Sequence, residues 1–280
     1  MKKKFLLTII LVTALALTLT ACGGEKKAAE QTTWERVQAE GKLVAGLDDN
    51  YPPMGYRNEN NELVGFDIEM GAELGKRLGI EIEWQPSAWD GIVASLKAKK
   101  FDVIISGMTI TEERLQEVDF AGPYIYAAQA LAVKADNEDV KAAADLAGKV
   151  VGTQNGSTGL KVAEELNTEI GFSEIKGYSD YALAFQDLKI GRLDAIISDN
   201  YVIAGYIENM PGEFKFTGEL FSEETNGIAV RKEDKDLYEA INGALEEMIV
   251  DGTMGQLAEK WLGGDVTLQL KEQILAERNK

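Results

Sequence analysis

The sequence has 280 residues, of which 45% are hydrophobic, so it can form one large globular domain or two of ordinary size. Its 29 basic and 47 acidic residues give a formal net charge of −18, and no basic stripe is present that could bind phosphates, which argues against nucleic-acid binding. The absence of histidine excludes His-based catalysis and His metal sites. The single cysteine, Cys22, excludes internal disulfides and Cys-based metal clusters, so we expect neither a metal nor a cofactor.

The first 31 residues are typical of a targeting segment. Lys2-Lys3-Lys4 is followed by an apolar stretch, 5–19, that is too short for a transmembrane helix. This stretch leads to Ala21-Cys22, which is similar to a bacterial lipoprotein signal, where the cysteine is acylated and becomes the first residue. We therefore predict a signal peptide at 1–21, lipidation of Cys22 and a lipidated polar tether at 22–31. An ordinary secretory signal with a chance cysteine is the alternative.

Beyond residue 31, helical periodicity alternates with short apolar runs. In chain order we expect a helix beginning at Thr32–Glu35, a strand at 43–47, a loop at 48–53, a turn at 58–62, a helix at 68–78, a strand at 80–84, a helix at 89–96, a strand at 103–105, a helix beginning within 109–112, a loop at 119–124 and a long strand at 126–133. This alternation predicts an α/β fold with a mostly parallel sheet.

The turn within residues 102–114 concentrates polar groups. An apolar run ends at Ser106-Gly107, and Thr109 has the spacing of a capping box with Glu112. Hydroxyls, free N–H groups and the Arg114 guanidinium would then meet where a strand ends, which favours binding of a small anion such as a carboxylate. A capped surface helix with a solvated arginine is the alternative.

An internal echo predicts the architecture. Residues 96–106 and 188–198 share a pattern of leucine, a basic residue, aspartate, an apolar pair and serine. The matched positions are Asp102 with Asp194, Ser106 with Ser198 and, more weakly, 41–44 with 148–151. Because both echoes occur in the same order, we predict two similar α/β lobes, with chance similarity of buried strands as the alternative.

Polar residues follow the echoed strands. They are Asp48, Tyr51, Ser106 to Arg114, Gln154 to Thr158, and Asp199. In open α/β sheets ligands bind beyond the carboxyl ends of the strands, so facing lobes would place these groups in one cleft. A cation at Arg114 and an anion at Asp199 would suit a zwitterionic α-amino acid.

Several motifs spread over roughly residues 32–265 carry a family resemblance. They are Gly65–Met70 with Leu74, Gly75 and Leu78; Ser106–Thr111 with Arg114; Phe120 with Pro123-Tyr124; Asn226–Lys232; Asn242–Leu245; Asp251–Thr253; and Lys260–Leu262. In this combination the chain resembles the family 3 extracellular solute-binding proteins, the amino-acid receptors of ABC importers. The resemblance implies a two-lobed α/β periplasmic-binding-protein (Venus-flytrap) fold of type II, with two hinge strands. Lobe one would comprise 32–126 and 226–265, lobe two 128–223, the hinges 126–129 and 222–226, and a C-terminal tail 266–280.

The resemblance also implies the ligand contacts. Arg114 would bind the ligand carboxylate with Thr109, the backbone of Gly107 and, from lobe two, Thr158; Asp199 would bind the α-ammonium with Ser106 nearby; Tyr51 and Trp89 would enclose the side chain; and Asp48 and Gln154 would meet its far end. Tyr51 and Trp89 could equally be packing residues. The charge of Asp48 and the indole of Trp89 favour arginine, lysine or ornithine, with glutamine next.

The expected function is binding without chemistry. The lobes would close on a polar amino acid in the periplasm or outside the cell, and an ABC permease with its ATPase subunits would receive it. The lipid on Cys22 would anchor the protein, expected to be a monomer, at the extracytoplasmic face of the cell membrane. One alternative is an enzyme like the periplasmic dehydratases of this fold, with Asp48 or Asp199 as proton donor. The other is an amino-acid sensor.

Overall fold

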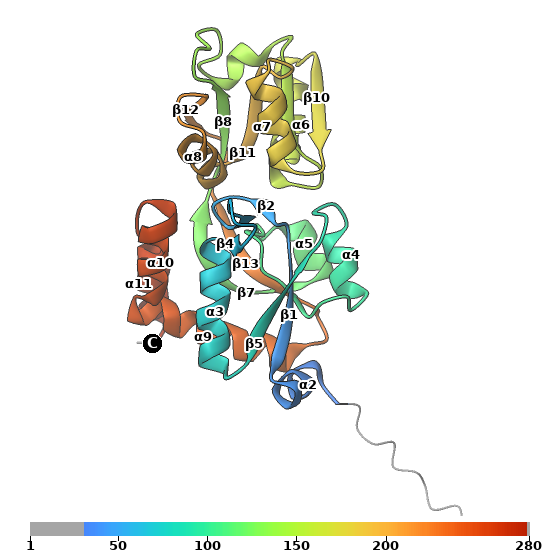
Figure 1. Cartoon of the computed structure of the whole chain (residues 1–280), viewed down its shortest axis with the longest axis vertical. Helices are drawn as coiled ribbons and strands as arrows, with labels where there is room; N and C mark the ends of the chain where they lie inside the picture. The colour runs from blue at the N-terminus through green and yellow to red at the C-terminus, as the bar shows by residue number, and fades with distance from the viewer. Residues whose placement is uncertain (1–30, 279–280) are drawn as a thin grey trace, which may run out of the picture. The chain divides into compact units, whose positions relative to one another are not determined.

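The computed structural model describes residues 31–278, and the elements below belong to one compact unit, Thr33–Lys280. The predicted signal peptide, Cys22 and all but the last residue of the predicted tether lie outside the described residues. Figure 1 draws this part of the chain, residues 1–30, as a grey trace. Among the residues that are described, no helix is long and apolar enough to cross a membrane.

The first sheet has five strands in the order β5-β1-β6-β13-β7 (Figure 1). Their bounds are β1 Lys42–Leu47, β5 Glu81–Pro86, β6 Val103–Ile104, β7 Asp119–Ala127 and β13 Glu224–Val230. β1 is parallel to β5 and β6, whereas β13 is antiparallel to β6 and β7. The carboxyl ends of the three parallel strands therefore lie at one edge of this sheet.

The second sheet repeats this plan, with strand order β10-β9-β11-β8-β12. Its strands are β8 Gln129–Lys134, β9 Val150–Gln154, β10 Glu174–Tyr178, β11 Ala195–Asp199 and β12 Phe214–Leu220. β9 is parallel to β10 and β11, and β8 is antiparallel to β11 and β12. A small third sheet joins β2 Asn50–Tyr51, β3 Gly55–Arg57 and β4 Leu63–Val64.

The echoed aspartates make equivalent hydrogen bonds in the two halves. Asp102 precedes β6, and its Oδ2 accepts from the N–H of Val44 in β1 at 3.0 Å. Asp194 precedes β11, and its Oδ2 accepts from the N–H of Val150 in β9 at 2.8 Å. In each half one carboxylate thus joins the start of the third parallel strand to the first. The sequence echo therefore reflects a structural repeat.

Helices cover both sheets. They are α2 Thr33–Glu40, α3 Phe66–Leu78, α4 Ile92–Lys97, α5 Glu112–Glu117, the 3₁₀ helix η1 Ala143–Leu146, α6 Thr158–Ile170, α7 Tyr181–Lys189, α8 Asn200–Asn209, α9 Lys235–Asp251, α10 Thr253–Leu262 and α11 Leu268–Arg278. α3 and α9 contact each other and the first sheet, and α6, α7 and α8 contact the second (Figure 1). Fully buried residues of the second sheet, such as Leu131, Val151 and Ile197, form one apolar cluster with residues of α6. The strands thus read as apolar runs because both faces of each sheet are covered.

The chain passes between the two sheets twice. β7 of the first sheet ends at Ala127, and β8 of the second begins at Gln129. The return runs from the end of β12 at Leu220 to the start of β13 at Glu224. Two short crossings of this kind connect lobes that can move as bodies about a hinge.

Two segments differ from the expectation based on sequence. Residues 119–124, expected to be a loop because of Gly122-Pro123, belong to strand β7. A proline without an N–H fits there because β7 is the edge strand of its sheet and its pairing with β13 has a register shift between Asn226 and Ile228. The expected long strand 126–133 is two strands, because the chain leaves one sheet at Ala128 and enters the other.

The helix after Ser106-Gly107 begins within the expected range, but its cap is not the expected residue. α5 starts at Glu112, and its N-cap is Thr111, whose hydroxyl accepts from the N–H of Arg114 at 3.1 Å. Thr109 is therefore not the cap of a capping box. It forms a β-bridge with Asn226 instead, which leaves its hydroxyl for other partners. The helix expected at 89–96 begins later, at Ile92, because Gly91 is left-handed, with φ 84°.

Candidate functional site

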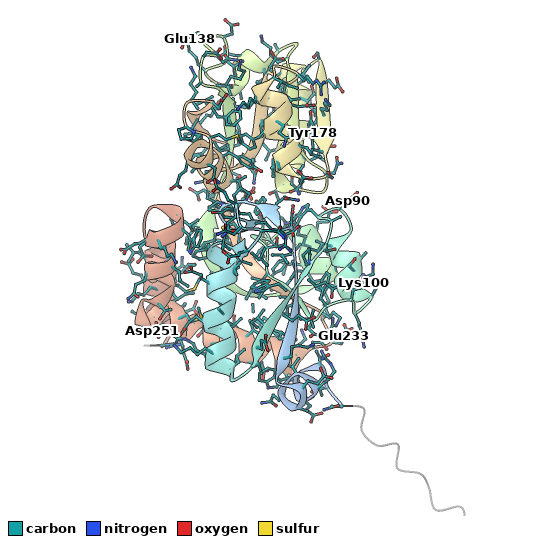
Figure 2. The ribbon with its side chains drawn as sticks, in the orientation of Figure 1. Asp90, Lys100, Glu138, Tyr178, Glu233 and Asp251 are labelled. Atoms are coloured by element: carbon teal, nitrogen blue, oxygen red, sulfur yellow. The ribbon has the colours of Figure 1, made fainter. Side chains whose placement is uncertain are left out.

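The residues that follow the parallel strands of the two sheets meet in one cluster. Asp48 follows β1, Ser106 and Thr109 follow β6, and Gln154 and Asp199 end β9 and β11. These five side chains are each at most 5% exposed. Figure 2 places Asp90, the neighbour of Trp89, at the edge of the first lobe that faces the second. Contacts between the two lobes define the candidate site.

Asp199 is the anionic centre of the cluster. Its Oδ2 accepts from the hydroxyl of Tyr51 in the other lobe, and its Oδ1 accepts from Nε2 of Gln129 at 2.9 Å. Burial raises the pKa of Asp199 to about 7, and the nearby charge of Glu224 raises it further, while the bond from Tyr51 opposes the rise. No Lys or Arg of residues 31–278 forms an ion pair with Asp199. This carboxyl is therefore suited to a cation supplied by a ligand.

Asp48 and Gln154 form a second contact between the lobes. Nε2 of Gln154 donates to Oδ2 of Asp48 at 2.6 Å and also to the carbonyl oxygen of Ser179 at 3.1 Å. The N–H of Asn50 donates to Oδ1 of Asp48, and the N–H of Asp48 donates to Oγ of Ser106. Burial raises the pKa of the Asp48 carboxyl to about 6, because these hydrogen bonds only partly offset the desolvation. Ser106 thus orients Asp48.

Aromatic rings lie beside Asp199 in the same contact between the lobes. The rings of Tyr51 and Trp89 are nearly parallel, with centroids 6.5 Å apart and planes 9° apart. Tyr201 meets the Tyr51 ring edge-on, and its hydroxyl lies 3.4 Å from the Tyr51 hydroxyl. Tyr51 is 6% exposed and Trp89 is 9% exposed, so both rings are buried within the contact between the lobes.

Arg114 is the cation of the cluster. Its guanidinium lies over the Trp89 ring, with Cζ 5.4 Å from the centroid. Nη1 donates to the carbonyl oxygen of Thr109 at 2.8 Å, and Nη2 donates to that of Gly156 in the other lobe at 3.2 Å. Nε1 of Trp89 donates to the same Gly156 oxygen at 3.2 Å. Burial lowers the pKa of the guanidinium, while the charges of Asp199 and Glu224 oppose that change.

The threonines predicted to bind a carboxylate contact one already. Oγ1 of Thr109 donates to Oε2 of Glu224 at 3.0 Å, and Oγ1 of Thr158 donates to the same atom at 3.2 Å. Nε2 of Gln129 lies 3.2 Å from this oxygen as well. Sequence reasoning missed Glu224 and Gln129 as site residues, although both lie in or beside the segments predicted to be hinges.

Gly107 is held by a buried acid that sequence reasoning also missed. Its N–H donates to Oδ2 of Asp67 at 2.7 Å, and the hydroxyl of Tyr124 donates to Oδ1 at 3.0 Å. The Gly107 N–H is therefore taken by Asp67 and does not face a bound anion here. The φ angle of Gly107 is 54°, and a Cβ added at this position would lie 2.8 Å from the Tyr51 ring, so only glycine fits there.

The cluster combines one guanidinium, two carboxyls of raised pKa and several aromatic rings. The predicted site residues Asp48, Tyr51, Trp89, Ser106, Thr109, Arg114, Gln154, Thr158 and Asp199 all join this network through the contacts above, and Gly107 adjoins Tyr51. Within the described residues, no group of three or more His, Cys, Asp or Glu side chains could hold a metal ion. The arrangement fits reversible binding of a small zwitterion.

Comparisons with known proteins agree with this geometry. The family model described as "Bacterial extracellular solute-binding proteins, family 3" matches residues 43–264. The L-cystine-binding protein TcyJ of Escherichia coli (strain K12) is 37% identical over 258 residues, which cover 92% of this chain and 96% of that protein. Together these matches span both lobes.

Solved structures show the same fold. An ancestral arginine-binding protein bound to arginine is 45% identical, with a TM-score of 0.75, over 79% of this chain and 98% of that one. The ancestral amino acid-binding protein AncCDT-1, a precursor of cyclohexadienyl dehydratase, is 36% identical, with a TM-score of 0.77, over 82% and 99%. The predicted two-lobed type II fold is thus confirmed. The chain belongs to the family 3 bacterial extracellular solute-binding proteins.

Proposed function

We propose that this protein captures a polar L-amino acid outside the cell and delivers it to a membrane permease of an ABC transporter. The observation that carries the proposal is the presence of one cation, Arg114, and one anion, Asp199, in the same contact between the lobes without an ion pair between them. Arg114 presents a guanidinium fork for an α-carboxylate, and the buried Asp199 carboxyl forms no ion pair among the described residues, although the charge of Arg114 acts on it. An α-amino acid supplies a carboxylate for the first group and an ammonium for the second.

The far end of the cleft favours a cationic side chain. Asp48 is buried, and its hydrogen bonds come from a backbone N–H and an amide, neither of which carries charge. A guanidinium or ammonium would lower the cost of burying this carboxylate. We therefore rank arginine, lysine and ornithine first and glutamine next. The similarity to an ancestral arginine-binding protein supports this order.

Cystine is a second candidate, because TcyJ, a relative similar over 92% of this chain, is an L-cystine-binding protein. A second α-ammonium at the far end would suit Asp48. The second carboxylate would need a cation there, but the charged groups that act on Asp48 are the acids Asp49 and Asp180. This local charge favours arginine over cystine.

The membrane context is part of the same proposal. We infer that a lipid on Cys22 anchors a monomeric protein at the extracytoplasmic face, with a permease and its ATPase subunits as partners. The cysteine follows a signal-like sequence, and relatives of this kind serve ABC transporters, which supports the inference. Radiolabelled palmitate should be incorporated into the parent protein during expression in bacteria and not into Cys22→Ser.

An enzymatic role is the alternative that one comparison favours. AncCDT-1 is a precursor of cyclohexadienyl dehydratase, and Asp48 and Asp199 have pKa values near neutrality that suit a proton donor. Incubating the protein with prephenate and arogenate tests this role directly. If the parent protein converts either compound and Asp199→Asn does not, the function is catalysis and not binding for transport.

Calorimetric titration with the common amino acids and cystine tests the proposed function. We expect L-arginine, L-lysine or L-ornithine to bind most tightly, and Arg114→Ala to weaken binding by at least about a hundredfold, because a buried charge-assisted fork is lost. Arg278→Ala is the control, since this exposed arginine pairs with Glu246 of α9 outside the network. If no α-amino acid binds, or if Arg114→Ala binds as well as the parent, the proposal is wrong.

A further inference from the structure

Glu224 is an anion in the part of the cleft where an anion of the ligand is expected. It is the first residue of β13, directly after the second crossing between the sheets. Its Oε2 atom is within hydrogen-bond distance of Thr109 Oγ1, Thr158 Oγ1 and Gln129 Nε2, at 3.0, 3.2 and 3.2 Å. Its Oε1 atom accepts from Oγ of Ser222 at 2.9 Å. Within residues 31–278 all of these hydrogen-bond partners are neutral, and the charge of Glu224 also acts on the Arg114 guanidinium.

The two threonine hydroxyls can serve only one carboxylate at a time. Each hydroxyl has a single hydrogen, and both hydrogens are directed to Oε2 of Glu224. The α-carboxylate of an amino acid bound at Arg114 is expected to use the same two hydroxyls. Two carboxylates at this point would also repel each other. Glu224 must therefore give up these bonds, or the ligand must bind without them.

A cavity beside Glu224 gives its side chain room to move. This cavity of about 390 Å³ is lined by Thr109, Thr158, Lys161, Glu223 and Glu224, among others. Lys161 is exposed and forms no ion pair among the described residues, so its ammonium is free to receive a displaced carboxylate. A carboxylate released from the threonines thus shares this cavity with the cation of Lys161 and with two further acids, Glu165 and Glu223.

We propose that Glu224 determines specificity by competing with the α-carboxylate of the ligand for the hydroxyls of Thr109 and Thr158. The inference rests on the proposed function and adds a residue that weakens binding of amino acids. A cationic amine that lacks the α-carboxylate does not meet this competition, because Glu224 can keep both hydroxyl bonds while Asp199 binds the amine. Glu224 therefore narrows the difference in affinity between an amino acid and its decarboxylated amine.

The test compares Glu224→Gln with the parent by calorimetry at pH 8, using L-arginine with agmatine and L-lysine with cadaverine as matched pairs. The substitution keeps the shape of the side chain and removes its charge. We expect the amino acid to bind about tenfold more tightly, the equivalent of one charge-assisted hydrogen bond, and the amine to bind no more tightly than before. Glu223→Gln is the matched control, because it removes the same charge from an exposed neighbour that lines the same cavity.

Each outcome separates the two proposals. If the parent binds no α-amino acid in the wider screen, the proposed function fails and this inference fails with it. If the parent binds an amino acid and Glu224→Gln binds it equally or less tightly, the competition by Glu224 is refuted and the proposed function stands. Equal tightening for the amino acid and its amine, or in Glu223→Gln, would show a general charge effect and also refute the inference. Glu224→Asp, which withdraws the carboxylate by one methylene, answers the same question if Glu224→Gln does not fold.

Discussion

Binding of an amino acid should weaken strongly as the pH falls from 8 to 5, because two carboxyls in the cleft have raised pKa values. In the free protein the pKa of Asp199 is about 7 and that of Asp48 is about 6, in both cases mainly because of burial. A bound ammonium favours the charged form of Asp199, so the pKa of this carboxyl falls on binding. Below pH 7 binding must therefore release a proton, and each further pH unit costs about tenfold in affinity.

The size of the effect depends on the ligand. At pH 5, two units below the pKa of Asp199, any α-amino acid should bind about a hundredfold more weakly than at pH 8, which is about 2.7 kcal/mol. A cationic side chain must also ionise Asp48, so L-arginine should lose about a further tenfold, whereas L-glutamine should not. The charges of the amino acids themselves hardly change in this range.

Calorimetry at pH 8, 7, 6 and 5 measures these slopes, and titration in two buffers of different ionisation enthalpy counts the protons released. Asp199→Asn should bind both amino acids weakly at every pH. Its affinity should also lose the pH dependence that L-arginine and L-glutamine have in common, because this part comes from ionisation of Asp199. Asp180→Asn should reduce only the additional slope of L-arginine, because the charge of Asp180 raises the pKa of Asp48. An affinity for L-arginine that stays constant between pH 8 and 5 in the parent would refute the assignment of both carboxyls to cation binding.

Three further predictions concern the same region. Arg114→Lys keeps the charge but loses the fork, so L-arginine should bind at least about tenfold more weakly in calorimetry; unchanged affinity would show that a point charge is enough. Gly107→Ala should lower the free energy of unfolding, measured in urea, by about 2–4 kcal/mol, because φ is 54° and the new methyl group would lie 2.8 Å from the Tyr51 ring. Gly79→Ala is the control: its φ is 70° but the space around it is open, so it should cost about 1–2 kcal/mol. Equal costs for the two variants would contradict the packing argument. Asp67→Asn should flatten the dependence of the free energy of unfolding on pH. The pKa of Asp67 is about 7 in the folded chain and 3.8 for an ordinary aspartate, so between these values the folded chain binds more protons than the unfolded chain and gains stability as pH falls from 7 to 4. If the difference in unfolding free energy between pH 7.5 and 5 is the same in the variant and the parent, this role of Asp67 is contradicted.

The repeat, and the clustering of the polar residues that follow the parallel strands, were predictable from sequence because they depend on local patterns. Asp102 and Asp194 occupy matching places before apolar runs, and the structure gives them matching hydrogen bonds to the first strand of each sheet. The carboxyl ends of those strands then fix where Asp48 and Asp199 lie. The periodicity of the sequence carries this information directly.

Other features depend on pairing across the chain and could not be predicted in this way. Residues 119–124 form a strand although Pro123 favours a loop, because the partner strand β13 comes about 100 residues later and supplies an irregular register. Glu224 has no local motif that marks it as a site residue. Its importance comes from Thr109 and Thr158, which approach it from different elements.

The buried acids of the described residues differ in whether a Lys or Arg pairs with them. Asp102 and Asp234 lie away from the cleft, and each pairs with a buried or half-buried arginine, Arg36 or Arg231. Asp48 and Asp199 are just as buried, yet no Lys or Arg of the described residues pairs with either. Burial of an unpaired carboxyl is unfavourable. Asp67 bears this cost while it holds Gly107 and Tyr124 in place. Under the proposed function, the cations of a bound amino acid would relieve the cost at Asp48 and Asp199, which would link the instability of these two carboxylates to the affinity for the ligand.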